Sequence, residues 1–245
     1  MRRQATICAF VLLAIAASAC AREGSLQDAV EIAVTKTREA QSWRSAGNMT
    51  YADATGVTLE LSFESEFAAP DRSHSRGIRN GDWHETIVIG DDIYLRSSDE
   101  PGWCQSPCEY DGRGVAVVPG SFWKELEFLD LLVDLERLPD EQVGGLVWSH
   151  YRGKLDQDSY WDMLETGVAT ESGQPTENPA LLQIRMLETQ FELWIDGDDY
   201  VRQIESEWRF TDPGLETGNG RLIIQRQHLR FHDFNEPIAI ERPSV

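Results

Sequence analysis

Two copies of one hairpin pattern constrain the fold of this chain more than any other feature. In the first copy, an apolar run from Thr86 to Ile89 meets Gly90-Asp91-Asp92, and a second run from Ile93 to Leu95 follows. Residues 193–202, LWIDGDDYVR, repeat this order of apolar run, acidic turn, aromatic residue and arginine. Glycine and aspartate tolerate the backbone angles of a tight reversal, so each pattern predicts a β-hairpin. Together they predict an up-and-down antiparallel sheet.

The segment Val57–Phe67 is the clearest single strand. The residues on one predicted face are Val57, Leu59, Leu61, Phe63 and Phe67, and the residues on the other are Thr58, Glu60, Ser62, Glu64 and Glu66. Such alternation predicts one buried face and one face in water. We also expect strands at 43–51, 144–156, 191–195, 200–210 and 220–233, a polar turn region at 70–81 and a loop at 167–178. Residues 179–187 fit either a helix or a strand.

Two long segments have helical patterns, and residues 159–165 also fit a short helix. Residues 23–42 combine a capping box, Ser25 with Asp28 three residues later, with an apolar stripe that should lie on the sheet. Residues 120–138, with Ser121 as a cap and Pro139 after the end, also predict a helix. Its apolar residues cover much more than one stripe, so it is either a central core helix or a helix lining an apolar cavity. The fold class expected is α+β.

The N-terminus has the pattern of an export signal. A basic start, Met1–Arg3, precedes an apolar run, Ile7–Ala17, that is too short to cross a bilayer comfortably. The next residues, Ala17-Ser18-Ala19-Cys20, resemble a bacterial lipobox, although Ala17 stands where that motif usually has leucine. We expect a signal at residues 1–19 and a membrane-anchored envelope lipoprotein acylated at Cys20, with palmitate as one such chain. Ordinary signal cleavage stays open, because Ala17-Ser18-Ala19 also fits that pattern.

The charge and the length of the chain restrict its possible partners and its number of domains. Residues 1–19 carry two arginines and no acid, so their removal leaves 226 residues and moves the formal net charge from −20 to −22. Such acidity opposes binding to nucleic acid or to an anionic membrane surface. The length suffices for one substantial core, no second long apolar run exists, and no linker divides the chain. We therefore expect one domain at 20–245.

The search for catalytic or metal-binding patterns yields little. Cys104 and Cys108 favour a local disulfide, because a zinc pair would need further ligands nearby. His228 and His232 would lie about 13 Å apart along a strand, too far to share a metal. The acids at Asp196–Asp199 are typical of a turn, and a calcium site there is the weaker interpretation because the spacing of a calcium loop is missing. No nucleophile elbow or phosphate loop is present, so we expect no enzyme, metal or cofactor.

The order of these features resembles the LppX/LprG-type bacterial lipoproteins of the LolA/LolB-like superfamily. The matching elements are the signal with Cys20, the first helix, Val57–Phe67, ETIVIGDDIYLR followed by Trp103, FELWIDGDDYVRQIESEW and FHDFNEPIAIERP. The resemblance implies a half-barrel, which is a curved antiparallel sheet with helices packed in its concave face around an apolar pocket. It also implies a protein that binds lipids or lipidated ligands and carries or presents them across the envelope.

The surplus of apolar residues and this resemblance together predict a lipid-binding cavity. We expect three walls: Val57, Leu59, Leu61, Phe63 and Phe67; Leu126, Leu129, Leu132 and Val133; and Ile204, Trp208, Leu229 and Phe231. Gln225 and Gln227 would add polar groups to the third wall, where a headgroup could bind. The alternative is a non-enzymatic envelope interaction or sensor module with a filled core and no lipid. A hydrolase is the weakest interpretation, since no nucleophile–base pattern exists.

Overall fold

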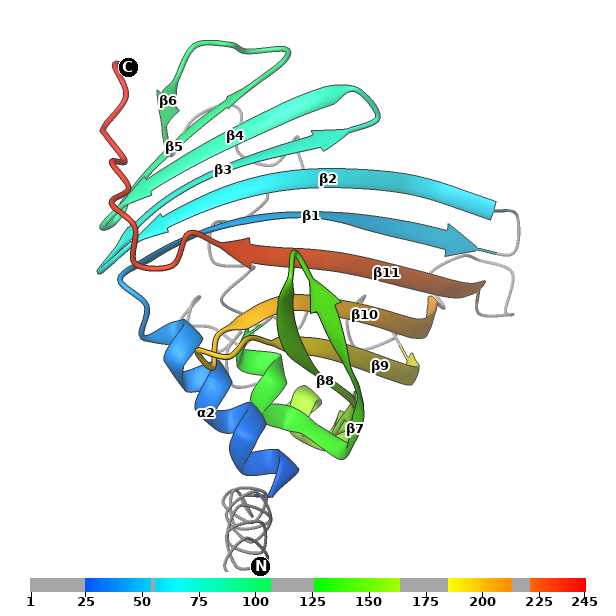
Figure 1. The fold of residues 1–245 in the computed structure, drawn as a ribbon. Helices are drawn as coiled ribbons and strands as arrows, with labels where there is room; N and C mark the ends of the chain where they lie inside the picture. The colour runs from blue at the N-terminus through cyan, green and yellow to red at the C-terminus, as the bar shows by residue number, and fades with distance from the viewer. Residues whose placement is uncertain (1–24, 54–55, 107–125, 164–184, 213–220) are drawn as a thin grey trace, which may run out of the picture.

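The fold is a single antiparallel sheet that curves around a set of helices (Figure 1). This computed structural model describes residues 25–53, 56–106, 126–163, 185–212 and 221–245. Within these residues the strand order is β6-β5-β4-β3-β2-β1-β11-β10-β9-β8-β7. Sequence neighbours pair throughout, except where β1 joins β11 and so connects the two halves. The expected curved α+β half-barrel is confirmed.

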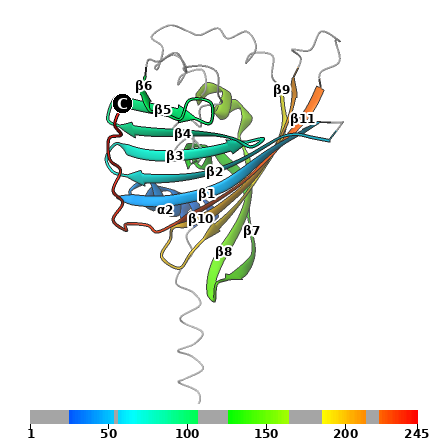
Figure 2. The same ribbon diagram turned by 90° about the horizontal axis from the view of Figure 1, so that it is seen from above.

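The elements have the following bounds. The helical elements are α2 (Leu26–Arg38) and η1 (Leu129–Leu131). The strands are β1 (Ser42–Asp53), β2 (Gly56–Ala68), β3 (Arg72–Arg79), β4 (Asp82–Ile89), β5 (Asp92–Ser97), β6 (Cys104–Gln105), β7 (Leu132–Val143), β8 (Leu146–Leu155), β9 (Arg185–Ile195), β10 (Val201–Asp212) and β11 (Arg221–His232). Figure 2 shows the strand direction changing strongly between β3–β5 and β7–β9, as expected for a twisted, curved sheet.

Both hairpins are confirmed. Strands β4 and β5 pair from Ile89↔Asp92 outward, and Gly90 supplies the positive φ of 60° that the turn requires. In the β9–β10 turn, Oδ1 of Asp196 accepts the backbone N–H groups of Asp198 and Tyr200, each at 2.9 Å. This acid therefore holds the turn through local hydrogen bonds. Among the described residues, no cluster of His, Cys, Asp and Glu has the arrangement of a metal site.

The first helix begins as its sequence predicts. Ser25 Oγ accepts the N–H of Asp28 at 3.1 Å, and Asp28 Oδ2 accepts the N–H of Ser25 at 2.8 Å, which completes the capping box. The helix buries Val30, Ala33, Val34 and Thr37 against the sheet. It ends at Arg38, earlier than the predicted residue 42, because β1 already begins at Ser42.

The predicted helix at 120–138 is wrong over its second half. Residues 126–128 are helical and η1 follows, but Leu132 starts the long strand β7; residues 120–125 lie outside the described part. Register shifts in β7 fall between Val133 and Glu136 and between Leu138 and Glu141. The first bulge adds a residue, so Leu132 and Leu135 both pack against the apolar core, whereas Leu138 pairs with His150 on the opposite side of the sheet. A spacing of three residues in a bulged strand thus imitates a helical stripe.

Strand β3 replaces the predicted turn region at 70–81. It pairs with β2 and β4 along its length, although it offers no large apolar residue to the side occupied by Ser73, Ser75 and Gly77. Without an alternating apolar pattern, sequence periodicity gives no strand signal. The ambiguous segment 179–187 is part of β9 from Arg185 onward, and its earlier residues lie outside the described part.

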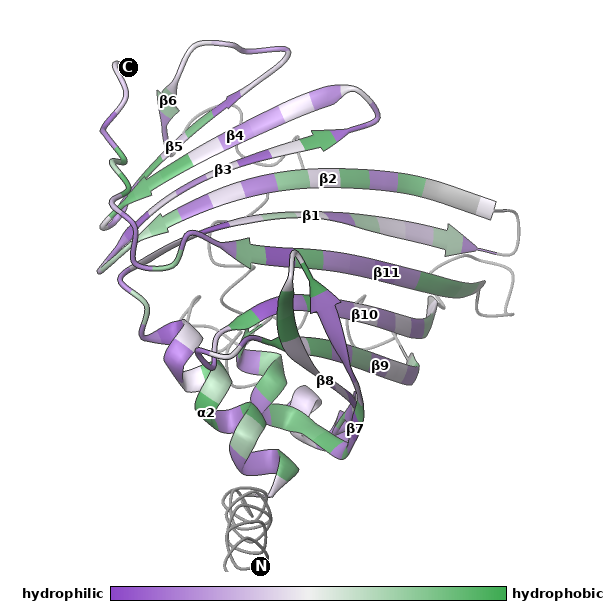
Figure 3. Cartoon of the chain, viewed as in Figure 1, coloured by the Kyte–Doolittle hydropathy of each residue, from purple (hydrophilic) through white to green (hydrophobic). Residues whose placement is uncertain are grey.

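The main core lies on one face of the sheet, which we call the inner face. Trp43 stacks on Phe67 at 5.5 Å between ring centroids and meets the edge of Phe231 at 5.4 Å. Trp208 makes edge contacts with Phe128 at 5.7 Å and with Phe191 at 5.4 Å. The alternation of hydrophobic and hydrophilic positions along β2 is visible in Figure 3. The opposite, outer face carries most of the charged residues of the central strands.

A second, smaller core lies on the outer face near β5. Ile87 and Tyr94 are buried there against Ile240 of the C-terminal segment. This segment runs along the ends of β1 to β5 in Figure 1, and its Ile240 carbonyl accepts a hydrogen bond from Arg72. In the part of the chain that the structure describes, no helix has the length and hydropathy that a membrane crossing requires.

Candidate functional site on the inner face

The structure gathers most of the predicted wall residues into one apolar cluster. Buried together in the main core are Phe63, Phe67, Leu126, Leu129, Leu132, Ile204, Trp208, Leu229 and Phe231, and Leu61 packs against them half-buried. Leu59 is half-buried on β2. Val133 is 40% exposed, and the side chain of Val57 is not described. Sequence patterning thus found the apolar residues that meet in space, while their contact with a lipid stays a prediction.

Helix α2 and the short helical turns cover one half of the inner face. Thr37 of α2 is fully buried, and its Oγ1 donates to the Ala33 carbonyl at 2.8 Å while accepting the Val201 N–H at 2.9 Å. This pair of hydrogen bonds joins α2 directly to the start of β10. Phe128 and Tyr160, from the helical segments at 126–128 and 157–163, stack edge to face at 5.4 Å.

Beside the aromatic residues Trp43, Phe63 and Phe67, strands β1 to β4 also carry a row of polar residues on the inner face. The register places Ser45 beside Ser65, Ser65 beside Ser75, and Ser75 beside Thr86, so four hydroxyl residues form one row across four strands. All four are buried, with exposed fractions of 2%, 5%, 3% and 3%. Among the described residues, no hydrophobic side chain of β3, β4 or β5 belongs to the main core.

Three hydroxyls of this row have no hydrogen-bond partner within the part of the chain that the structure describes. They are the Oγ atoms of Ser45, Ser65 and Ser75, each shielded from solvent. Gln227 is a fourth such case: it is 5% exposed on β11, and its Oε1 also has no partner. Buried polar groups are nearly always hydrogen-bonded in folded proteins, so adjacent exceptions require an explanation. The sequence predicted polar groups at Gln225 and Gln227 but missed the hydroxyl row.

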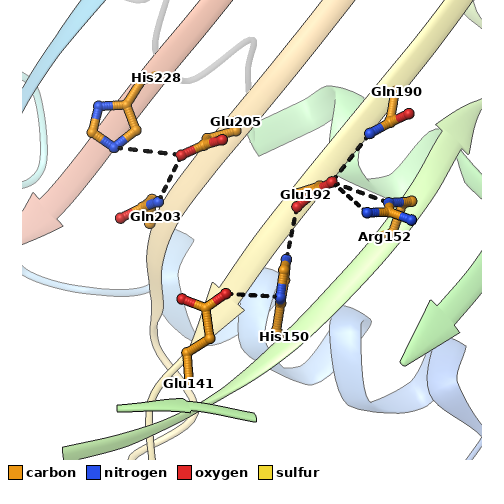
Figure 4. Close-up of polar contacts among 8 residues, drawn as sticks. All are labelled: Glu141, His150, Arg152, Gln190, Glu192, Gln203, Glu205 and His228. Carbon is orange, nitrogen blue, oxygen red and sulfur yellow. Dashed lines mark hydrogen bonds and ion pairs between the residues drawn. The ribbon is translucent and has the colours of Figure 1, made fainter. Parts of the chain in front are cut away.

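The outer face carries ion-pair networks, one of which centres on Glu192 (Figure 4). Arg152 donates to Glu192 Oε1 from Nε at 3.0 Å and from Nη2 at 2.9 Å, and His150 Nε2 lies 2.9 Å from Oε2. The other ring nitrogen of His150 lies 3.2 Å from Glu141, and its ring stacks on Trp194 with centroids 4.2 Å apart. These contacts neutralise charge between adjacent strands.

The electrostatics of Glu192 follow from this geometry. Burial alone would raise the pKa of Glu192, but the hydrogen bonds and charges of Arg152 and His150 outweigh it and hold the pKa below its ordinary value. A second outer network has the same composition: Glu85 lies 2.6 Å from His74 Nε2 and 2.7 Å from Arg96 Nε. Both networks consist of intrachain pairs and stabilise the sheet.

A scan against protein-family models and a search of curated proteins returned no match. Among solved structures, the lipoprotein LppX from Mycobacterium tuberculosis is similar over 90% of this chain and 100% of its own, with a TM-score of 0.52 and 13% identity. LprF from Mycobacterium bovis is similar over 89% of this chain and 97% of its own, with a TM-score of 0.50 and 10% identity. This chain has the LppX-type fold. The sequence resemblance is thereby confirmed at the level of the fold.

The remaining predicted site residues lie at the edges of the described part or beyond it. Cys104 is half-buried on the short edge strand β6, whereas Cys108 lies outside the described residues. The Cys104–Cys108 disulfide therefore stays a prediction. Cys20 and the signal segment also lie outside the described residues, so acylation stays a prediction as well.

Proposed function

We propose that this protein is an envelope-anchored lipoprotein that binds a lipid or lipidated ligand against the inner face and carries or presents it. The observation that carries the proposal is the composition of the inner face. A large apolar core lies beside a row of buried hydroxyls on β1 to β3 that have no hydrogen-bond partner among the described residues. Buried hydroxyls without a partner lower the stability of a folded domain unless a ligand or water supplies their hydrogen bonds.

The fold likeness supports the same proposal. LppX has the same fold and is itself a lipoprotein. For this chain we propose a signal at residues 1–19, acylation of Cys20 and one binding domain at 20–245, on the extracytoplasmic side of the envelope. A Cys104–Cys108 disulfide would close the short loop after β6. The binding activity needs no catalytic group, so we propose no enzymatic role.

Organic extraction of the protein purified from its native host, followed by mass spectrometry, tests the binding function. The proposal expects a defined lipid in each preparation and none in an unrelated envelope protein purified in parallel. Repeated recovery without lipid would refute it. Metabolic labelling with a fatty acid tests the anchor separately: the wild type should incorporate label and the Cys20→Ala variant should not.

The second candidate is an interaction module without a lipid ligand. The dense packing of Phe128, Phe191 and Trp208 under α2 favours it, because that half of the inner face leaves its described side chains in mutual contact. The two functions differ at the hydroxyl row. A crystal structure that shows this row closed by protein side chains, with every buried hydroxyl hydrogen-bonded, would favour the module.

A further inference from the structure

His150 of β8 is a buried, ionisable residue with a carboxylate at each ring nitrogen. Its Nε2 lies 2.9 Å from Glu192 Oε2 on β9, and its Nδ1 lies 3.2 Å from Glu141 Oε1 on β7. The residue is 6% exposed, and its ring stacks on Trp194 of β9 with 16° between the ring planes. Figure 4 shows the ring between the two carboxylates. His150 therefore connects the two strands on either side of its own.

The two contacts require a hydrogen on each ring nitrogen. A carboxylate only accepts hydrogen bonds, and a neutral imidazole carries one N–H group, whereas the imidazolium carries two. The cation can therefore satisfy Glu141 and Glu192 together. In the neutral ring, one nitrogen presents its lone pair to a carboxylate oxygen, and the two repel each other. Because histidine side chains ordinarily change charge between about pH 5 and 8, this link between three strands depends on a proton.

The contact with Glu141 is the one that opens when the ring loses a proton. Glu192 is held on its other side by Arg152, whose Nη2 lies 2.9 Å from Oε1. Burial alone would raise the pKa of Glu192, but Arg152 and the imidazole outweigh it and hold that pKa below its ordinary value, so this carboxylate stays ionised. The Glu192 side chain is 19% exposed and that of Glu141 is 49% exposed, so Glu141 exchanges the ring for water more readily. Two more acids lie on this face, Glu136 opposite Arg152 and Glu205 opposite Glu192.

The Glu141 contact holds a part of the β7–β8 hairpin where the sheet ladder is weak. Within the described residues, β8 pairs with β9 only from Ser149 to Gly153, so the tip of the hairpin lies beyond this pairing. On the other arm, the register shifts between Leu138 and Glu141. Glu141 comes directly after this irregularity, and its contact with the imidazole ties the arm back to the paired part of the sheet. Figure 2 shows the hairpin projecting past the ends of the neighbouring strands.

The tip of this hairpin is apolar and borders a cleft. Leu146 and Val147 are both more than half exposed at the tip. Val147 lines a cleft between the hairpin and α2, together with Leu26 and Ile32 of the helix. A movement of the hairpin therefore changes how open this apolar cleft is.

We propose that the protonated ring of His150 is a lock, which ties the β7 arm of the hairpin to the sheet through Glu141 and releases the tip when the proton leaves. The sign follows from the geometry. The lock is complete while the ring is an imidazolium, and it is lost as the pH rises. The lock involves only outer-face residues and needs no ligand on the inner face, so it can fail or hold independently of the proposed function.

Hydrogen exchange, followed by mass spectrometry on the mature chain at about pH 5.5 and about pH 8, tests the lock. After correction for the intrinsic effect of pH, peptides that cover residues 139–148 should exchange at least about threefold faster at the higher pH, which is the effect of one partly exposed ion pair. Peptides from β1 and β2 should show the same corrected rate at both pH values. An NMR titration of the ring, assigned with His150→Gln, should show its transition at the same pH as the change in exchange.

Glu141→Gln is the decisive variant. Its amide can accept a hydrogen from the protonated ring and can donate one to the neutral ring, so residues 139–148 should exchange at the same corrected rate at both pH values. Glu136→Gln is the matched control, because Glu136 is an exposed acid of the same strand that lies opposite Arg152 and not opposite the imidazole. This control should keep the pH dependence of the wild type.

Three results overturn the inference. Equal corrected exchange of residues 139–148 at the two pH values in the wild type would show that the proton locks nothing. A Glu141→Gln variant that keeps the wild-type pH dependence would show that another group carries it. Faster exchange at the higher pH throughout the sheet would show a global loss of stability instead of a local release of the hairpin.

Discussion

The contact between Thr37 and Val201 provides the sharpest test of how the cover of the inner face is held. Thr37→Val keeps the shape of the side chain but removes the hydroxyl that accepts the Val201 N–H at 2.9 Å. The Ala33 carbonyl loses the Thr37 hydroxyl as a donor but remains in the backbone hydrogen-bond pattern of the helix. The buried N–H of Val201, in contrast, is left without an acceptor. An orphaned buried donor costs about 1–3 kcal/mol of unfolding free energy.

For a chain of this size, a loss of about 2 kcal/mol lowers the thermal midpoint by about 4–8 °C. Thr37→Ser is the matched control, because it keeps the hydroxyl and loses one methyl group, worth about 1 kcal/mol. Urea unfolding should therefore rank the wild type above Thr37→Ser and Thr37→Ser above Thr37→Val. Hydrogen exchange should be faster at the Val201 amide in the valine variant alone. A valine variant at least as stable as the serine variant would refute the reasoning.

Two further predictions concern the sheet. A Cβ on Gly47 would lie 2.7 Å from the Phe63 ring and clash with the His228 carbonyl oxygen, so Gly47→Ala should cost about 1–3 kcal/mol in urea unfolding. Gly197→Ala, whose Cβ meets nothing, should be nearly neutral, and equal effects of the two changes would contradict this account. The lowered pKa of Glu192 stabilises the fold above the unfolded-state value of about 4.3, and that contribution is lost as the pH falls through the folded pKa. Glu192→Gln should therefore destabilise by about 1–3 kcal/mol at neutral pH and by progressively less below about pH 4, as followed by urea unfolding across pH; a pH-independent difference would count against it.

The parts of the fold that sequence could predict are those with a local signal. The alternation in Val57–Phe67 and the Gly-Asp turns each contain their own structural information, and β2 and the two hairpins formed as expected. The capping box at Ser25 and Asp28 likewise marked the start of α2. Where a segment's own pattern determines its conformation, reading the sequence was sufficient.

Strands β3 and β7 had no such local signal. Strand β3 has small and polar residues where an apolar face is expected, and its conformation follows from pairing with β2 and β4. In strand β7 the first bulge puts Leu132 and Leu135, three residues apart, against the main core. In both segments the sheet partner overrides the local pattern, which periodicity cannot anticipate.

The residues of the candidate site also fall into those that the sequence could predict and those that it could not. The apolar wall could be predicted, because buried residues such as Phe67, Ile204 and Leu229 lie on patterned strands. The hydroxyl row could not, because Ser45, Ser65 and Ser75 become neighbours only through the register of three strands. One sequence signal did exist: Ser65 is the single polar position on the apolar face of Val57–Phe67.

Native mass spectrometry of the mature chain purified from its host tests the central claim most directly. The account predicts a complex that carries one lipid, which gentle collisional activation releases intact. Wild-type protein that repeatedly shows only its unliganded mass would contradict the account.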